Sequence, residues 1–457
     1  MLAAVAFCPL GAAPAYAQIA ASVPADFTVA AVGDMIQTRP IVPIIEGQSP
    51  ELLKILQDAD VTFGNYETTA LDFSAFDGHP EAPNGGSTIF SEKTVPADLK
   101  AMGFDIVSRA NNHVTDWGVK GMQISNRLLD DAGVTHAGSG DSLMAARAGR
   151  FYDTAAGQRV GLVSMASTFV PSSRAEDPLG EVRGRPGLSA LRLKRTLTVS
   201  PERLAELAQI RSGRPYDLME RQPTQTDVDF FGVQFRSVAG QQRTGISFKA
   251  DPRDELQILS AIRQAKQTSD YVIATIHAHE PGNYAEIPDF LMDFARKSID
   301  AGADQFIGHG PHQLRGIEIY KGRPIFYSLG NFSFMLNDMR PLTPDFYEMA
   351  AVPQQPGQTP AEYSESFRKT WFGEPYWWES VVAVTRNNPD GTFAEVRLYP
   401  IELNLAAADR NKGVPRLAPP AVGNKVLAHL RDLSAPLGTV ITIENGVGVI
   451  RSGGARR

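Results

Sequence analysis

Histidines and carboxylates cluster at the ends of several apolar segments of this sequence. Five of the eight histidines lie in three short clusters, at positions 113, 277 and 279, and 309 and 312. Asp34 and Glu67 follow two further apolar segments. A lone histidine is usually a hydrogen-bonded structural residue, but several imidazoles beside two carboxylates suit a metal site with oxygen and nitrogen ligands. The pattern therefore predicts a metal centre.

The types of ligand limit which metal sites are available. Cys8 is the only cysteine, which excludes an internal disulfide and a cysteine-based zinc site. A mixed set of Asp, Glu, Asn and His ligands does not select sharply among Mn, Zn, Fe, Mg and Ca. We expect one or two divalent metal ions, whose identity the sequence leaves open.

The segments before these clusters have the pattern of buried strands. Continuous apolar runs of strand length occur at 27–32, 60–63, 105–107, 271–276 and 305–307. Helical spacing occurs between them, at 253–268 and at 287–299, where Gly302 ends the helix. This alternation predicts an α/β fold. Functional residues of open α/β sheets collect outside the carboxyl ends of the strands, where the histidines and carboxylates fall.

Length and charge exclude some classes of protein. The 457 residues suffice for two or three domains, or for one large α/β domain with insertions. The net charge of −7, without a basic cluster, argues against a nucleic-acid partner. Beyond the N-terminus, no uninterrupted apolar run is long enough to span a membrane, so we predict no transmembrane segment in the mature chain.

The N-terminus has the pattern of an export signal. Residues 1–17 are small and apolar, and Ala15-Tyr16-Ala17 fits an A-x-A cleavage site. The alternative is a buried N-terminal helix, for which Pro9 and Pro14 are poor material. We expect an exported protein that is periplasmic or associated with the cell envelope.

Other stretches interrupt the strand–helix alternation. Residues 171–250 and 336–378 are interpreted as two insertions, and 379–457 as C-terminal strands with a short helix. A hairpin is predicted with its turn at Asp390-Gly391. The second insertion contains an aromatic cluster. Its members are Trp371, Tyr376, Trp377 and Trp378. They would either form a lid or stacking surface, or pack that insertion on the core.

Six segments resemble, in order, the motifs of a known family. They are Gly33-Asp34, Gly64-Asn65-Tyr66-Glu67, Asn111-Asn112-His113, His277-Ala278-His279-Glu280, Gly308-His309-Gly310-Pro311-His312 and Ser328-Leu329-Gly330-Asn331-Phe332. Together they resemble the CapA family of bacterial capsule (poly-γ-glutamate) synthesis proteins, which is similar in fold to the calcineurin-like metallophosphoesterases. The resemblance covers residues 26–335. It implies a four-layer α/β/β/α sandwich with insertions and a small C-terminal β-containing region.

The resemblance also implies roles for individual residues. His113 would be the acid or the group that orients the substrate. Ile36 stands where the phosphoesterase pattern has a histidine, and Asn65 where it has an aspartate that bridges two metals. A neutral amide bridges two cations poorly, so a single ion or a weak second site is plausible. The implied metal ligands are Asp34, Asn65, Glu67, Asn112, His277, His309 and His312.

Four further residues near the clusters have open roles. His279 and Glu280 could act as general base and acid on an amide or an acidic α-proton, or Glu280 could orient a ligand histidine. Asp116 could hold the His113 imidazole, or could sit in the first turn of a new helix. Arg315 could bind a substrate carboxylate or phosphate through its guanidinium fork.

The resemblance implies a function in the metabolism of capsule or another cell-envelope polymer. We expect metal-dependent hydrolysis or transfer at a γ-glutamyl or peptide amide, with a γ-glutamyl or peptide polymer and other capsule-synthesis proteins as partners. One alternative is a metallophosphoesterase that acts on a phosphate ester. The other is a non-catalytic assembly or export component that binds an anionic polymer. Fold alone does not decide among these three.

Overall fold

The computed structural model describes residues 22–81, 88–213, 222–241, 243–407 and 410–453. The predicted export signal, residues 1–17, lies outside this range. Among the described helices, none has the length and apolar character needed to cross a bilayer.

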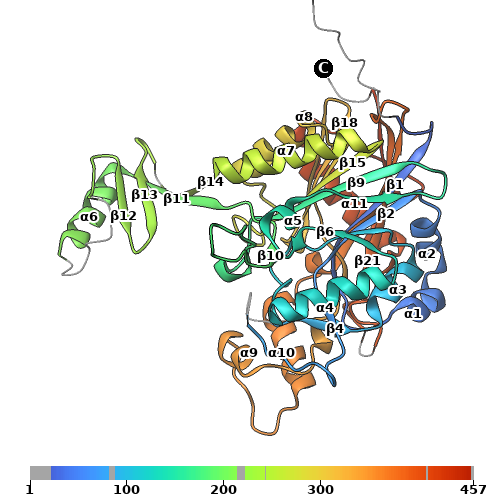
Figure 1. The fold of residues 1–457 in the computed structure, drawn as a ribbon, viewed down its shortest axis with the longest axis horizontal. Helices are drawn as coiled ribbons and strands as arrows, with labels where there is room; N and C mark the ends of the chain where they lie inside the picture. The colour runs from blue at the N-terminus through green and yellow to red at the C-terminus, as the bar shows by residue number, and fades with distance from the viewer. Residues whose placement is uncertain (1–21, 82–87, 214–221, 242, 408–409, 454–457) are drawn as a thin grey trace, which may run out of the picture.

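Two large sheets form the centre of the molecule (Figure 1). In the first, β19 (Asn331–Phe334) pairs with the end of β1, and β22 (Arg416–Leu417) pairs with β21. The order of its other strands is β23 (Thr442–Glu444), β24 (Val447–Arg451), β21 (Phe393–Glu402), β20 (Glu379–Asn387), β1 (Phe27–Ile36), β2 (Val61–Tyr66), β5 (Ile106–Ser108) and β6 (Thr135–Ala137). β1, β2, β5 and β6 run parallel, so their carboxyl ends meet at one edge.

The second sheet also has a parallel centre. β15 pairs in parallel with both β16 and β9, which places the carboxyl ends of all three strands together. Its strand order is β17 (Leu314–Tyr320), β18 (Arg323–Leu329), β16 (Gln305–His309), β15 (Tyr271–His277), β9 (Arg159–Ala166) and β8 (Arg150–Asp153).

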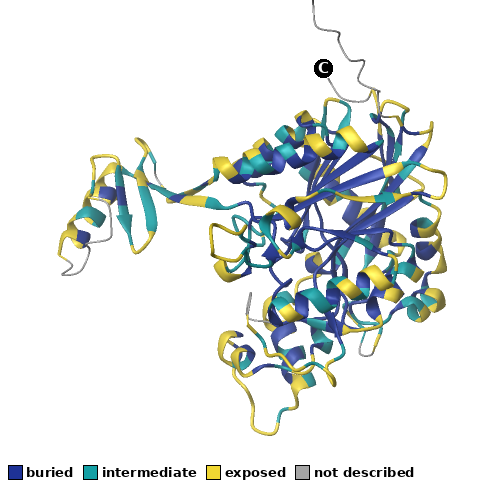
Figure 2. Cartoon of the chain, in the orientation of Figure 1, coloured by how far each residue is buried: buried dark blue, intermediate teal, exposed yellow. Residues whose placement is uncertain are grey.

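The two sheets pack face to face and helices cover their outer faces (Figure 2). Val29 and Phe63 of the first sheet share a core with Ile273 and Ile307 of the second. Strands buried on both faces need apolar side chains on both, which explains the continuous apolar runs of β1 and β15. The predicted α/β/β/α sandwich is confirmed. The outer helices are α1 (Val42–Gln48), α2 (Pro50–Gln57), α3 (Val95–Met102) and α4 (Gly118–Asp131) over the first sheet, and α7 (Pro252–Thr268) and α8 (Asp289–Asp300) over the second.

Local signals set the helix ends. The side chain of Asp251 accepts hydrogen bonds from the backbone N–H groups of Arg253 and Asp254, which caps α7. Gly103, with φ at +104°, ends α3 in the left-handed conformation that glycine tolerates. The segments 253–268 and 287–299, predicted from spacing, correspond to α7 and α8.

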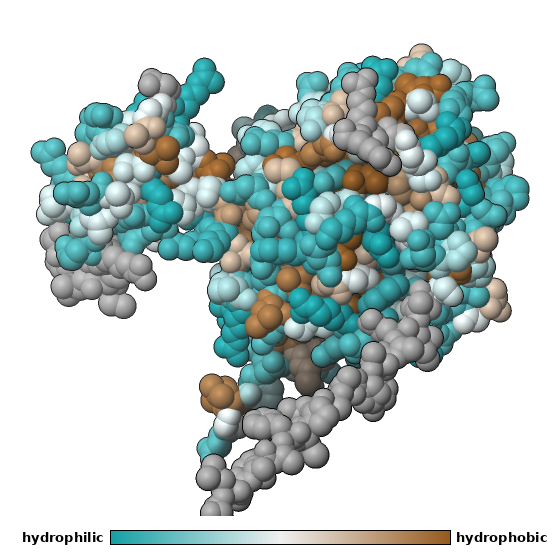
Figure 3. Space-filling model, turned by 90° about the horizontal axis from the view of Figure 1, so that it is seen from above, coloured by the Kyte–Doolittle hydropathy of each residue, from teal (hydrophilic) through white to brown (hydrophobic). Residues whose placement is uncertain are grey.

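Within the predicted insertion 171–250, the described residues from 193 onward form a lobe beside the second sheet. Its β11 (Leu193–Val199), β12 (Asp227–Phe230), β13 (Val233–Ser237) and β14 (Gly245–Ala250) make a separate sheet, which α6 (Pro201–Ser212) covers. Figure 1 and Figure 3 show this lobe set apart from the main body. Nearer the body lie α5 (Leu143–Arg147), the turn η1 (Pro171–Ser173) and the short pair β7 (Ser139–Gly140) and β10 (Gly187–Leu188).

The second insertion packs under the first sheet. It contains η2 (Leu336–Asp338), α9 (Pro344–Met349), α10 (Pro360–Phe372) and η3 (Pro375–Trp377), and its apolar side chains join the core of α1 to α3. Trp377 and Trp378 are buried, whereas Trp371 and Tyr376 are exposed. The aromatic cluster therefore combines packing with an open surface. Nearby, β3 (Thr69–Leu71) pairs with β4 (Phe90–Glu92).

The C-terminal strands extend the first sheet. The predicted hairpin is β20 and β21, and β20 pairs antiparallel with β1 over Phe27–Ala31. The C-terminal region is thus integrated into the main sheet, next to the strand that carries Asp34. Helix α11 (Pro420–Ser434) and the turn η4 (Ala435–Leu437) pack against β17, and α11 also contacts β21.

Candidate metal centre

Parallel pairing brings the predicted ligands to one place, where the carboxyl ends of both sheets meet. Asp34 lies opposite Asn65 in the β1–β2 register. His277 and His309, the last residues of β15 and β16, lie opposite each other in the second sheet. The loops that follow these strands and β5 carry the other predicted residues: Glu67, Asn112, His113, His279 and His312.

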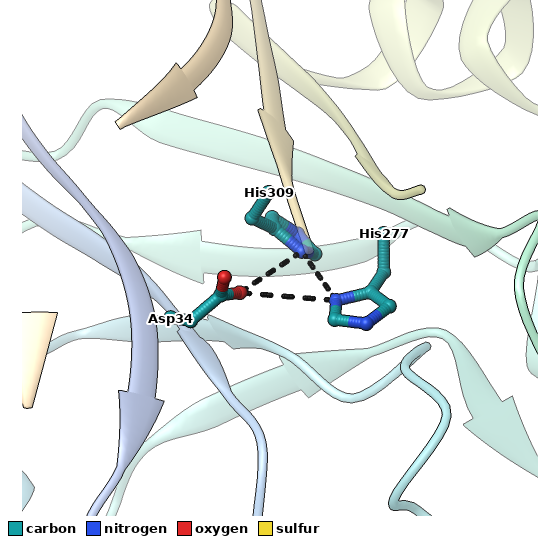
Figure 4. Close-up of side chains that lie close together, drawn as sticks. All are labelled: Asp34, His277 and His309. Atoms are coloured by element: carbon teal, nitrogen blue, oxygen red, sulfur yellow. Dashed lines mark hydrogen bonds and ion pairs between the residues drawn. The ribbon is translucent and has the colours of Figure 1, made fainter. Parts of the chain in front are cut away.

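Asp34, His277 and His309 form the first group of ligands (Figure 4). The Nδ1 atoms of the two histidines lie 3.0 Å apart. Oδ1 of Asp34 lies 3.8 Å from Nδ1 of His277 and 3.7 Å from Nδ1 of His309. All three side chains are buried.

Glu67, His277 and His279 form a second group that shares His277 with the first. Nε2 of His277 lies 2.9 Å from Nε2 of His279 and 3.4 Å from Oε1 of Glu67. Glu67 is completely buried, and within the described residues neither of its carboxylate oxygens has a hydrogen-bond partner. Such a carboxylate is costly to bury unless a proton or a cation accompanies it.

Hydrogen bonds fix which ring nitrogens face the cluster. The Thr275 hydroxyl donates to the carbonyl of Ile307, so it accepts from Nε2–H of His309 and leaves Nδ1 of His309 with a lone pair. Likewise, Oδ1 of Asn283 accepts from Nδ1–H of His279 at 2.6 Å, which leaves Nε2 of His279 with a lone pair. These contacts orient both rings toward His277.

The arrangement around His277 fits a divalent cation. A neutral His277 has one N–H and faces two unprotonated nitrogens, so at least one of the two contacts near 3 Å joins two lone pairs. A divalent ion held by these nitrogens, Asp34 and Glu67 would remove this repulsion and neutralise the carboxylates. The donor set therefore suits one or two metal ions.

The pKa shifts agree with a set of neutral imidazoles. Burial lowers the pKa of His279 to about 3 and that of His309 to about 4, and it also lowers the pKa of His277. Burial, reinforced by the charge of Asp34, raises the pKa of Glu67. Burial opposes ionisation of Asp34, but its hydrogen bond to His312 and the nearby histidines lower its pKa overall. Neutral imidazole is the form that binds metals.

His312 closes the cluster beside Asp34. Its Nδ1 lies 3.0 Å from Oδ1 of Asn331 and 3.3 Å from Oδ2 of Asp34. The N–H of Gly310 donates to the same Asp34 oxygen at 3.0 Å. Gly310 has φ at +116°, and a Cβ there would press on the backbone of Ala278, so glycine is required for this approach.

Asn65 orients Asp34 from β2. Its Nδ2 donates to Oδ1 of Asp34 at 2.8 Å, and its Oδ1 accepts from Nδ2 of Asn111 at 3.2 Å. In this orientation the amide group presents its nitrogen to the cluster. The ligand roles predicted for Asn65 and Asn112 remain predictions.

His113 lies on the wall of a cavity of about 260 Å³ beside the cluster, together with Asn112, His279 and His312. Nδ1 of His113 bonds to Oδ2 of Asp116 at 2.6 Å, and burial raises the pKa of Asp116 to about 6. Asp116 precedes α4, so of its two predicted roles the structure shows the contact with His113. This contact leaves Nε2 of His113 available to a bound molecule.

Glu280 and Arg315 hold the loop after β15 in place, Glu280 from within the loop and Arg315 from β17. Ser167 and Thr168 donate their hydroxyls to the Glu280 carboxylate at 2.7 and 3.0 Å. Arg315 is fully buried and donates to the carbonyls of Glu280 and Tyr284 at 2.7 and 3.0 Å. Both residues thus position the loop that carries His279, and their predicted proton-transfer and substrate-binding roles remain predictions.

Comparison with known proteins identifies the family. Residues 28–335 match the family described as "Bacterial capsule synthesis protein PGA_cap". The chain belongs to this family. The matched range agrees with the six motifs and confirms the resemblance to the CapA proteins that they indicated.

Individual relatives span different shares of the chain. The chain is 45% identical over 440 residues to "Uncharacterized protein y4sH" of Sinorhizobium fredii, with 93% of each chain covered. It is 25% identical over 313 residues to "Capsule biosynthesis protein CapA" of Bacillus anthracis, covering 67% of this chain and 59% of that one. A "Probable polyglutamine synthesis accessory protein" of Mycobacterium tuberculosis is 28% identical over 239 residues, covering 52% and 47%.

Proposed function

We propose that this PGA_cap-family chain is an exported, metal-dependent enzyme that hydrolyses or transfers an amide bond of a γ-glutamyl or related peptide polymer. The observation that carries the proposal is the buried carboxylate of Glu67, which lacks hydrogen-bond partners within the described residues and lies 3.4 Å from His277. The names of the Bacillus anthracis and Mycobacterium tuberculosis relatives point to capsule and polyglutamine synthesis as the setting.

The residues that would hold the metal come from both sheets. Asp34, His277 and His309 would hold one ion, and Glu67 with His279 would complete a second site around His277. A bound divalent ion would supply a Lewis acid that polarises a carbonyl oxygen and lowers the pKa of water. His312 and Gly310 keep the Asp34 carboxylate in position.

His113 supplies the proton in this proposal. Asp116 holds Nδ1–H, so Nε2 faces the cavity. In the imidazolium form Nε2–H would donate its proton to the amide nitrogen that leaves, and the ring would return to the neutral form. Since Asp116 is buried, the His113 ring is fixed before the substrate binds, which reduces the entropy lost in the reaction.

A phosphate ester is a second candidate substrate. The paired His113 and Asp116 also suit protonation of a leaving alkoxide, and a metal cluster suits an anionic transition state. A chromogenic phosphodiester and a blocked γ-glutamyl peptide, assayed in parallel, separate the two reactions. Turnover of neither substrate by the metal-loaded protein would favour the non-catalytic binding component.

Metal content is the measurement that tests the proposal. We expect plasma mass spectrometry to find one or two equivalents of a transition or alkaline-earth metal in protein purified without a metal-binding tag. The His277→Ala variant, which removes the ligand shared by both groups, should lose it. His429→Ala, at an exposed position on α11, is the matched control and should retain the metal. A wild-type protein without metal at physiological metal concentrations would overturn the proposal.

A further inference from the structure

A wide cleft opens next to the metal centre, between the second insertion and the loop after β15. Its volume is about 630 Å³, in the range of small-molecule and peptide side-chain sites. The insertion contributes aromatic rings to it, and the loop contributes Asn283 and Tyr284. The aromatic residues of the insertion that line it are Phe367, Trp371, Phe372, Tyr376 and Trp377.

The cleft adjoins the cavity at the candidate metal centre. Asn283, Phe367 and Phe372 line both spaces. The His312 ring, which bonds to Asp34 on the other side, lies 6.3 Å from the Phe372 ring. A molecule with its reacting bond beside the histidines would therefore extend into the cleft.

The aromatic wall is held in place yet open to solvent. Phe372 and Trp377 pack edge to face with centroids 5.3 Å apart, and Tyr376 lies 4.8 Å from Trp377. Trp371 is 51% exposed and Tyr376 is 43% exposed. Exposed rings that neighbouring rings fix lose little conformational entropy when a ligand packs against them.

Three polar groups of the cleft are engaged within the protein. Nε1 of Trp371 donates to the carbonyl of Ala350 at 2.8 Å. The side chain of Asn283 accepts from His279, and Gln313 donates to the backbone carbonyl of Asn283. An apolar side chain needs no hydrogen-bond partner from the cleft, whereas each hydroxyl of a sugar ring that is buried there without a partner is destabilising.

The cleft also lacks a positive charge for a carboxylate. None of the described residues that line it is Lys or Arg. Arg315, behind the loop, donates to loop carbonyls, and Arg368 pairs with Glu365 and stacks on Trp378. A glutamate side chain in the cleft would lose water without gaining a cation.

We infer that the cleft binds an uncharged aromatic or large aliphatic side chain of a peptide substrate, adjacent to the amide at the metal centre. This inference rests on the proposed function for the identity of that amide. It narrows the class of possible substrates and disfavours a pure γ-glutamyl polymer, because that polymer carries a carboxylate on every residue. The substrate would instead place at least one apolar residue beside the reacting bond.

Binding can be measured without turnover. Two blocked dipeptides, N-acetyl-γ-glutamyl-phenylalanine amide and N-acetyl-γ-glutamyl-glutamate amide, would be titrated calorimetrically into the full chain in the presence of a chelator, with chitobiose as the sugar probe. We expect the phenylalanine peptide to bind at least ten-fold more tightly than the glutamate peptide, as burial of a phenyl ring implies. Chitobiose should bind more weakly than the phenylalanine peptide.

Variants of the cleft locate the site. Trp371→Ala and, independently, Tyr376→Ala should weaken the binding of the phenylalanine peptide several-fold, whereas Trp371→Phe, which keeps a ring, should remain within about two-fold of wild type. Phe231→Ala removes an exposed ring from the distant lobe and is the matched control. Circular dichroism verifies that each variant is folded.

Each alternative outcome overturns the inference. Tighter binding of the glutamate peptide or of chitobiose would replace the apolar ligand with an anionic or a sugar ligand. Unchanged affinity in both alanine variants would place the binding elsewhere. Failure of the proposed function gives a different result, namely intact binding of the phenylalanine peptide by a protein that holds no metal or turns over no amide.

Discussion

Asn283 accepts a hydrogen bond of 2.6 Å from Nδ1 of His279, on the side of the ring that faces away from His277. Asn283 also lines both the cavity at the candidate metal centre and the aromatic cleft. One side chain thus sets the tautomer of a candidate ligand and forms part of the wall along which a substrate would lie. The loop that carries it is held by Arg315 through the carbonyls of Glu280 and Tyr284.

Replacement of Asn283 by leucine should weaken metal binding. The variant loses the acceptor that keeps Nδ1 of His279 protonated, and loss of such an outer contact typically costs ten- to a hundred-fold in metal affinity. Asn283→Asp retains an acceptor and should bind metal at least as tightly as wild type. Competition with a chelating dye measures both affinities. Equal affinities of Asn283→Leu and wild type would show that the contact has no role in metal binding.

Glu67→Gln should impair metal binding without destabilising the metal-free protein. Burial already raises the pKa of Glu67, so the metal-free protein tolerates a neutral amide, and its Tm without metal should stay close to wild type. The rise in Tm on adding metal should be lost, because the amide is a much weaker ligand. Glu280→Gln is the control, since that carboxyl bonds to Ser167 and Thr168. If Glu67→Gln kept the full metal-induced rise, Glu67 would not be a ligand.

Much of the fold could be predicted because its signals are local. Apolar runs at β1, β15 and β16, and the glycine that ends α8, mark elements without knowledge of their neighbours. The Asp390-Gly391 turn likewise predicted the β20–β21 hairpin. Which strand a hairpin pairs with depends on distant residues, so its place beside β1 was not apparent from the sequence.

In the candidate site, too, some features could be predicted from the sequence and others depended on distant residues. Strand ends of parallel sheets meet, so the clustering of Asp34, His277 and His309 followed from the pattern. Thr275 and Asn283, which orient the rings of His309 and His279, were not identified, because no spacing links them to their partners. The closeness of Arg315 to His312 in sequence suggested a contact with the substrate, which stays a prediction. The hydrogen bonds of its guanidinium to loop carbonyls could not be read from that spacing.

Asp116→Asn should impair catalysis without loss of metal. The amide no longer stabilises a protonated His113 and does not enforce its tautomer, so we expect kcat for amide cleavage to fall about a hundred-fold, the usual range for a general acid. KM and metal content should change little, because Asp116 contacts neither group of ligands that share His277. Steady-state kinetics with metal analysis on the same sample tests this. An unchanged kcat would exclude His113 as the proton donor.

His136 in β6 should make folding sensitive to acid. Burial lowers its pKa to about 4, against 6.5 in the unfolded chain, so between these values the unfolded state binds more protons and stability falls as the pH falls. No stability is lost through His136 above pH 6.5, and the loss reaches about 3 kcal/mol by pH 4. Nε2 of His136 lies 3.2 Å from Oδ1 of the exposed Asp130, which opposes the lowering of the pKa. His136→Phe keeps a buried ring while removing both this contact and the titration. The free energy of unfolding in urea should fall less between pH 7 and pH 4.5 in His136→Phe than in wild type. In His429→Gln, the exposed control, it should fall as much as in wild type. An equal loss in all three proteins would show that His136 does not carry the effect.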